Sequence, residues 1–193
     1  MLKRRHLVAD LLKARGDALV VTGLGSPTYD VAAAGDDDRN FYLWGAMGSA
    51  AMLGLGLALA QPKQRVLVVT GDGEMLMGLG SLAAIAAQRP ANLAILVLDN
   101  EAFGETGAQA GLTGKGVDLS AVAAAAGFAE ALRATGPADV EMLARLLFQA
   151  KGPVFAAAKV ALDGEPMVLP PRDGRHLVQR FRAALLGRER AVG

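Results

Sequence analysis

Four short apolar runs, separated by Ala-rich stretches, restrict the fold of this chain more than any other feature. They lie at residues 18–25, 65–73, 92–100 and 153–160, and hydrophobic residues follow one another in them without polar alternation. A strand that is apolar on both faces must be covered on both faces, and helices between successive strands supply that cover. We therefore predict an α/β fold, a three-layer αβα sandwich with a mostly parallel sheet.

The segments between the apolar runs have the composition of helices. We predict four of them, at 47–62, 76–89, 118–128 and 139–152. Pro62 is expected to stop the first helix, and Asp118 is expected to cap the third. The whole chain, 1–193, is expected to be one domain, in which 163–193 forms a Pro- and Gly-rich tail that ends in a short amphipathic helix.

Composition argues against several classes of protein. The 193 residues are 52% hydrophobic and 20% charged, as in a globular chain with a sizeable core. The net charge of +1 offers no basic face for nucleic acid, and the cluster Lys3, Arg4 and Arg5 is expected to be a solvated turn. No segment has the roughly 18 consecutive apolar residues of a membrane span, and the N-terminal stretch lacks the apolar run of a signal peptide. Because the chain has no cysteine, it suits a reducing compartment, and we expect it in the cytoplasm.

The sequence Gly71-Asp72-Gly73 follows the second apolar run with no polar spacer. Glycines let the backbone turn sharply and approach a ligand, and the N–H groups of Gly73 and Glu74 can meet a phosphate at the start of the next helix. A carboxylate beside phosphates needs a cation between them, which points to Mg²⁺. Asn100 follows the third run and offers a second oxygen ligand. The alternative is that Asp72 only caps the helix that follows it.

This spacing, Gly-Asp-Gly followed by Asn100 after a helix and a strand, resembles the diphosphate and Mg²⁺ motif of thiamine-diphosphate-dependent enzymes. The resemblance is to their diphosphate-binding (PP) domain. It implies that Mg²⁺ is held by Asp72, Asn100 and the backbone carbonyl of Ala102. The family pattern usually ends in Asn-Asn, and Asp99 replaces the first of these two residues here.

A second stretch, at 44–60, resembles the family segment that shapes the cofactor. In that family a bulky apolar residue about 25 positions before the motif aspartate forces the cofactor into a V shape, and here this residue is Met47. The backbone carbonyl of Gly45 then faces the aminopyrimidine. The first Gly-rich turn corresponds to a diphosphate-binding loop, with Gly25 and Ser26 as its contacts. The alternatives are ordinary core packing for Met47 and a plain turn at Ser26.

Over about residues 17–128 the chain looks similar to the β subunit of sulfopyruvate decarboxylase and to the matching half of phosphonopyruvate decarboxylase. The resemblance implies decarboxylation of a 2-oxo acid by thiamine diphosphate with Mg²⁺. The glutamate that activates the cofactor then lies in a pyrimidine-binding (PYR) domain, expected here as a separate α subunit. Glu105 is a candidate for proton transfer, with a side chain that simply faces solvent as the alternative. Gln109 and Lys115 are candidates for binding an anionic substrate, with a mobile polar loop as the alternative.

Two other functions remain open from the sequence. One is the PP subunit of an acetolactate synthase-like carboligase. The other is a non-catalytic nucleotide-binding α/β protein, although the first Gly-rich turn lacks the third glycine of the dinucleotide-binding fingerprint.

Overall fold

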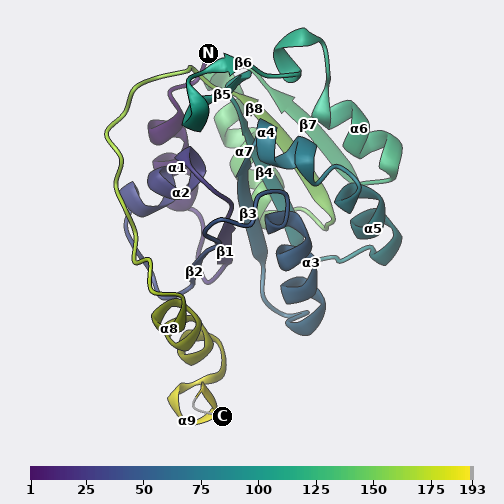
Figure 1. Cartoon of the computed structure of the whole chain (residues 1–193). Coiled ribbons are helices and arrows are strands. Elements are labelled where there is room, and N and C mark those ends of the chain that lie inside the picture. Colours follow the sequence, from purple (N-terminus) through teal and green to yellow (C-terminus); the bar gives the residue numbers. More distant parts are fainter. Residues whose placement is uncertain (192–193) are drawn as a thin grey trace.

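A parallel sheet of six strands forms the centre of the protein (Figure 1), as seen in a computed structural model that describes residues 1–191. The strand order is β2-β1-β3-β4-β8-β7, and all five pairings are parallel. The strands are β1 (Leu19–Thr22), β2 (Asn40–Tyr42), β3 (Val66–Gly71), β4 (Leu93–Asp99), β7 (Glu130–Ala134) and β8 (Val154–Lys159). A separate antiparallel pair consists of β5 (Ala102–Phe103) and β6 (Gln109–Ala110). The predicted fold class is confirmed.

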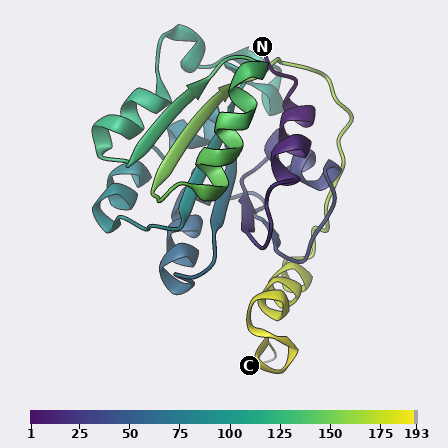
Figure 2. The same cartoon turned by 180° about the vertical axis from the view of Figure 1, so that it is seen from behind.

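Helices cover both faces of the sheet. One face packs against α1 (Arg4–Leu12), α2 (Ser26–Ala33) and α7 (Val140–Gln149), and Figure 2 shows α1 in purple and α7 in green on this side. The other face packs against α3 (Ala50–Ala60), α4 (Asp72–Met77), α5 (Ser81–Gln88) and α6 (Leu119–Ala126). Successive residues of β3 alternate between the two cores, since Leu67 and Val69 belong to the first and Val66 and Val68 to the second.

The register of the central strands fixes where the loops emerge. Gly71, the last residue of β3, lies opposite Leu98, the penultimate residue of β4. The strands are parallel, so their carboxyl ends reach the same edge of the sheet. The loops that carry Asp72 and Asn100 therefore leave that edge side by side.

Four differences from the predicted elements have local causes. The predicted helix at 47–62 begins only at Ala50, because Gly45 and Gly48 have positive φ and form a loop. The helix predicted at 76–89 is two helices separated by a turn at 78–80, where two of three residues are glycine. Strands β2 and β7 were not predicted because β2 has only three residues and β7 is partly polar. At Ser26, where a plain turn was the alternative, the helix α2 begins.

The N-terminal basic cluster is not the solvated turn that we predicted. Arg4 is buried at 4% exposure, and its guanidinium forms a short ion pair with Asp30 of α2, which is fully buried. Arg5 also reaches Asp30, at 3.2 Å, and Arg4 lies 3.5 Å from Asp163. Burial raises the pKa of Asp30, and the hydrogen bonds and charges of the two arginines oppose that rise. The cluster therefore fastens α1 to α2 and to the segment after β8.

Replacing Arg4 by methionine is expected to lower the free energy of unfolding by about 3 kcal/mol, because the carboxylate of Asp30 would lose its main partner inside the protein. Chemical denaturation measures this. Lys13→Met is the matched control, since Lys13 pairs with Asp10 at the surface and should contribute less than about 1 kcal/mol. Equal effects of the two substitutions would contradict a structural role for the buried pair.

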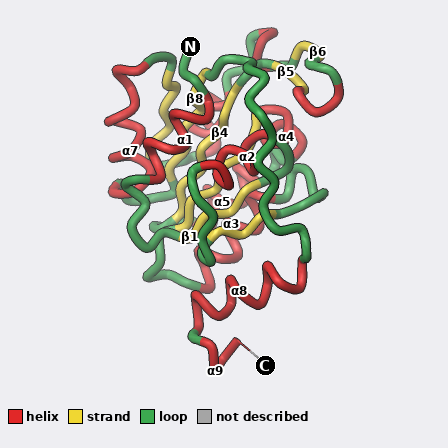
Figure 3. Tube along the Cα trace, turned by 90° about the vertical axis from the view of Figure 1, so that its left-hand side faces the viewer, coloured by secondary structure: helices red, strands yellow, loops and turns green. Residues whose placement is uncertain are grey.

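The segment after β8 runs along the outside of α1 and α2 as an extended stretch (Figure 1). It leads to α8 (Gly174–Leu186) and α9 (Arg188–Ala191), which project beyond the sheet in Figure 3. Helix α8 is held to β2 by a ring contact of 5.5 Å between Phe181 and Phe41. Arg180 adds an ion pair of 2.6 Å with Asp36. Within residues 1–191 no helix has both the length and the apolar character needed to cross a membrane.

Candidate active site

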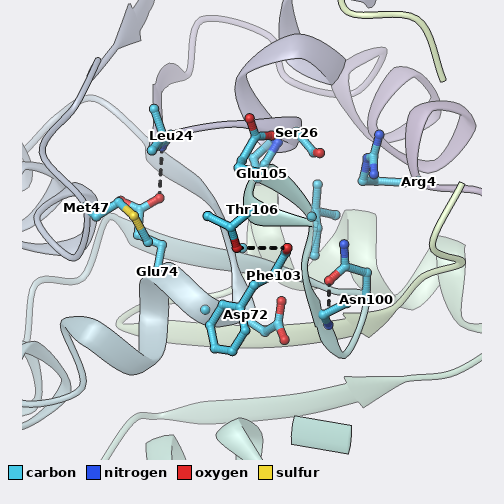
Figure 4. Close-up of a pocket in the computed structure, with 16 residues that line it drawn as sticks. Arg4, Leu24, Ser26, Met47, Asp72, Glu74, Asn100, Phe103, Glu105 and Thr106 are labelled. Carbon is cyan, nitrogen blue, oxygen red and sulfur yellow. Dashed lines mark hydrogen bonds between the residues drawn. The ribbon is translucent and has the colours of Figure 1, made fainter. Parts of the chain in front are cut away.

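A pocket of about 190 Å³ lies at the carboxyl ends of β1, β3 and β4 (Figure 4). Its walls include nine of the residues singled out from the sequence: Ser26, Met47, Gly71, Asp72, Gly73, Glu74, Asn100, Ala102 and Glu105. Gly25 and Gly45 do not line it, although each lies within two residues of one that does. Gln109 and Lys115 also lie outside its walls.

The strand order explains why a pocket opens at this place. From β1 the chain goes to β2 on one side, and it later returns to β3 on the other side. In open parallel sheets the loops diverge at such a switch point and leave a crevice beyond the strand ends, where ligands bind. The loops that follow β1 and β3 supply Ser26 and Asp72 to this pocket.

Asp72 is buried at 3% exposure, at the first position of α4. Its Oδ2 accepts a hydrogen bond of 2.9 Å from the hydroxyl of Thr113. Burial raises the pKa of Asp72, and the charge of Asp99 adds to the rise, while the bond from Thr113 and the backbone N–H of Gly73 oppose it. A carboxylate held in this way favours a cation nearby, because a cation offsets the cost of burying its charge.

Asp99 takes part in a buried charge network on the other side of Thr113. Its Oδ1 lies 2.8 Å from the same hydroxyl, and its Oδ2 lies 2.8 Å from the ammonium of Lys159. Lys159 also contacts Glu101 at 2.6 Å. Burial lowers the pKa of Lys159, but the hydrogen bonds and charges of the two carboxylates outweigh it and raise that pKa. Lys159 therefore balances the charge of the aspartate that replaces asparagine in the family pattern.

The donor set of the pocket fits a hard divalent cation. Asp72 offers a carboxylate, Asn100 an amide oxygen that now accepts a bond of 3.0 Å from the N–H of Ala102, and Ala102 a backbone carbonyl. Oxygen ligands of this kind suit Mg²⁺, which usually binds proteins through few side chains together with substrate phosphates. In the part of the chain that the structure describes, no three His, Cys, Asp or Glu side chains gather into a metal site. A diphosphate would thus have to complete the coordination.

Replacing Thr113 by valine is expected to weaken Mg²⁺-dependent ligand binding by about 10- to 100-fold, the usual loss when a residue that orients a metal ligand is removed. Valine keeps the shape of the side chain but leaves Asp72 without its hydroxyl partner. Titration of Mg²⁺ at fixed cofactor concentration measures the effect. Thr135→Val, an exposed position outside the pocket, is the control. If both variants bind Mg²⁺ like the wild type, Thr113 does not orient Asp72.

The loop after β1 lies against Glu105. Gly25 has φ of +77° and precedes Ser26, the first residue of α2, so a helix N-terminus that favours anions begins at the pocket wall. A Cβ on Gly25 would lie 2.7 Å from Oε1 of Glu105, so a larger residue at position 25 would push that exposed side chain aside. Tyr29 lies close to Glu105: burial raises the pKa of Tyr29, and the charge of Glu105 raises it further.

Met47 lies in the loop between β2 and α3, where it lines the pocket with 39% of its surface exposed. Gly45, two residues earlier, has φ of +76°, which glycine adopts without strain. Gln109, in the β5–β6 hairpin, forms hydrogen bonds with Thr106. Neither Gln109 nor Lys115, the side chains proposed for an anionic substrate, lines the pocket.

Sequence reasoning missed four residues that shape this site. Arg4 lines the pocket, Thr113 and Lys159 contact the acidic groups Asp72 and Asp99, and Tyr29 lies close to Glu105. The only sequence signal for Lys159 was a lysine at the end of an otherwise apolar strand. A buried lysine normally has an acidic partner, and Asp99 ends the neighbouring strand.

Comparisons with known proteins agree with this geometry. Residues 33–158 match the family described as thiamine pyrophosphate enzyme, C-terminal TPP binding domain. The chain is 36% identical over 181 residues to sulfopyruvate decarboxylase subunit beta of Methanothermobacter thermautotrophicus, and the alignment covers 94% of each chain. It is 42% identical over 183 residues to phosphonopyruvate decarboxylase of Streptomyces viridochromogenes, covering 92% of this chain but only 44% of that relative. The chain thus spans less than half of the second relative.

The fold is also present in solved structures. Benzoylformate decarboxylase from Polynucleobacter necessarius superposes with a TM-score of 0.72 at 17% identity, over 86% of this chain and 34% of that one. The likeness shows the fold. Together with the family match over 33–158, the relative aligned over 94% of its length shows that this chain belongs to the thiamine pyrophosphate enzyme family, among the relatives of sulfopyruvate and phosphonopyruvate decarboxylases.

Proposed function

We propose that this chain is the PP subunit of a cytoplasmic, two-subunit 2-oxoacid decarboxylase that uses thiamine diphosphate and Mg²⁺. The observation that carries the proposal is the meeting of Asp72, Asn100 and Met47 in one pocket, from three loops that are far apart in the sequence. The names of the relatives support a sulfopyruvate- or phosphonopyruvate-like substrate.

In this proposal the metal-binding and cofactor-binding residues of the pocket have the following tasks. Asp72, Asn100 and the carbonyl of Ala102 hold Mg²⁺, and the N–H groups around Gly73 and Ser26 bind the diphosphate. Met47 supports the organic half of the cofactor. When bound, thiamine diphosphate supplies the nucleophilic carbon and the electron sink that loss of CO₂ from a 2-oxo acid requires.

Proton transfer is divided between this chain and its partner. Glu105 lines the pocket beside Tyr29, so its carboxyl is placed where it can exchange a proton with the substrate. Glu74 also lines the pocket, but its carboxyl is engaged with the backbone of Leu24 at 3.0 Å. We therefore assign the glutamate that activates the cofactor to a second subunit. The relatives named "subunit beta" support the existence of such a subunit.

The exposed apolar face of α3 is evidence for a second subunit. The sequence of this helix, Ala50–Ala60, contains no polar residue, yet Met52, Leu53 and Leu59 are 44%, 36% and 49% exposed. A helix that is apolar on all sides is normally buried. The exposed side chains of Met47 and Met77, at 39% and 66%, extend the apolar character of this region to the pocket. We propose that the PYR subunit covers α3 and closes the pocket.

Co-expression tests the proposed activity. The partner to supply is the chain, from the same source, that matches the part of phosphonopyruvate decarboxylase outside the region aligned with this chain. We expect the pair, with thiamine diphosphate and Mg²⁺, to release CO₂ from sulfopyruvate or phosphonopyruvate, and each chain alone to be inactive. Formation of acetolactate from pyruvate would instead indicate a carboligase. Binding of a nucleotide but not of thiamine diphosphate would indicate a non-catalytic α/β protein.

A further inference from the structure

Glu74 is a buried acid whose side chain has no role in the proposed chemistry. It is 5% exposed, lies two residues after Asp72 in α4, and lines the pocket. Its Oε1 is buried and forms no hydrogen bond of ordinary geometry within the described residues. A carboxylate placed beside a diphosphate site opposes anion binding through its charge, so its presence calls for a compensating task.

The carboxyl of Glu74 lies where two loops meet. Its Oε2 accepts a hydrogen bond of 3.0 Å from the N–H of Leu24, in the loop after β1 (Figure 4). Burial raises its pKa, while the hydroxyl of Thr70 and the N–H groups of Leu24, Ala50 and Gly48 act to lower it. The carboxyl therefore faces donors from the loop after β1 and from the loop that precedes α3.

Backbone packing makes room for this arrangement. A Cβ on Gly23 would overlap Oε2 of Glu74, so the loop after β1 can approach only because residue 23 is glycine. A Cβ on Gly78 would overlap the carbonyl of Gly48, which places the loop before α3 directly on the turn after α4. Both loops thus pack against the short helix that carries Glu74.

The start of α3 lacks a cap of its own. Ser49 occupies the N-cap position but forms no side-chain hydrogen bond to the helix. The first N–H groups of a helix need acceptors, and a negative charge near them is favourable. The carboxyl of Glu74, in α4, lies close to this helix start, as the effect of the N–H groups of Ala50 and Gly48 on its pKa indicates. Since Met47 lies three residues before Ala50, fixing the start of α3 also fixes Met47 relative to Asp72.

We infer that Glu74 is a positioning residue that places Met47 against the organic half of the cofactor while Asp72 holds the metal-diphosphate half. The inference rests on the proposed function. In this inference the side chain of Glu74 fixes the loops around the pocket. Glu74 then affects the cofactor only through the position of Met47.

Hydrogen exchange tests the structural part without any cofactor. Glu74→Gln keeps the size of the side chain but removes its charge and replaces one of its two acceptor oxygens by an NH₂ donor. We expect the amides of Leu24, Gly48 and Ala50 to exchange about 10-fold faster in this variant, while the amides of the central strands stay unchanged. Glu141→Gln, at an exposed position of α7, is the control and should change none of these amides. Unchanged exchange at the three loop amides would overturn the inference.

A double-mutant cycle in the assembled two-subunit protein tests the link to the cofactor. We expect Glu74→Gln and Met47→Ala each to raise the Kd of thiamine diphosphate, in the presence of Mg²⁺, by about 10- to 100-fold. Because Glu74 acts through Met47, the double variant should bind no more weakly than Met47→Ala alone. The Kd of inorganic diphosphate with Mg²⁺ should change less than about 3-fold in all variants.

Two results would contradict the inference: additive losses in the cycle, or equal losses for thiamine diphosphate and inorganic diphosphate. Failure of the proposed function looks different, since the wild-type assembly would then bind no thiamine diphosphate while the loop amides still responded to Glu74→Gln. These two results together would mean that Glu74 fixes the loops but has no role in binding the cofactor.

Discussion

Replacing Asp72 by asparagine is expected to weaken Mg²⁺-dependent binding of thiamine diphosphate by more than about 100-fold, beyond the loss typical of residues that only orient a metal ligand. The carboxylate is the only charged group among the three proposed metal ligands. Calorimetric titration with and without Mg²⁺ measures the loss. Asp17→Asn, at an exposed position far from the pocket, is the control and should bind like the wild type.

The same substitution is expected to stabilise the chain in the absence of metal. Burial raises the pKa of Asp72 above its value in the unfolded chain, so the folded protein binds more protons between the two values. The contribution of this residue to stability therefore falls as the pH rises through that window, and asparagine removes the effect. We expect the melting temperature of Asp72→Asn to exceed that of the wild type by about 2–4 °C at pH 7 and by less at pH 4.

This pair of results separates a functional carboxylate from a structural one. If Asp72 only capped α4, its removal would lower the melting temperature and leave the binding of the cofactor unchanged. A lower melting temperature together with unchanged binding would therefore contradict the proposed metal site.

Replacing Met52 by aspartate is expected to weaken association with the second subunit by more than about 100-fold, because a charge would be buried at the centre of an apolar contact. Met142→Asp is a matched control. It is 48% exposed against 44% for Met52, but it lies on α7, on the other side of the sheet. Both side chains are exposed in the isolated chain, so neither substitution should change its melting temperature by more than about 2 °C.

Sedimentation of the chain mixed with its partner measures this effect, and decarboxylase activity should fall in parallel. Loss of the complex with Met52→Asp but not with Met142→Asp would place the partner on α3. Equal behaviour of the two variants would show that the apolar face of α3 has another use.

The sequence predicted the layers of this fold because its strands are apolar on both faces. The run at 92–100 is buried throughout as β4, Leu93–Asp99, and Asp118 caps α6 through hydrogen bonds to the N–H groups of Ser120 and Ala121. The polar edge strand β7 carried no such signal, since one of its five residues is fully buried. Local pattern is informative where both faces are buried, and it fails where only tertiary pairing defines a strand.

The candidate site could be predicted only in part, for a similar reason. Asp72 and Asn100 follow strands of recognisable pattern, and so the sheet places them together. Thr113 belongs to a short 3-10 helix, Thr113–Lys115, and follows Asp72 by 41 residues. Its hydroxyl meets Asp72 because the β5–β6 hairpin and the loop after it fold back over the sheet, and pairing at that distance leaves no periodic trace in the sequence.

The central claim is that this chain binds the diphosphate of thiamine diphosphate through Mg²⁺ at Asp72. Its most direct test is calorimetric titration of thiamine diphosphate into the chain, with and without Mg²⁺ and with and without the second subunit. We expect binding that requires Mg²⁺, becomes stronger with the partner and is lost in Asp72→Asn. Binding that is independent of Mg²⁺, or no binding by the folded assembly, would contradict the claim.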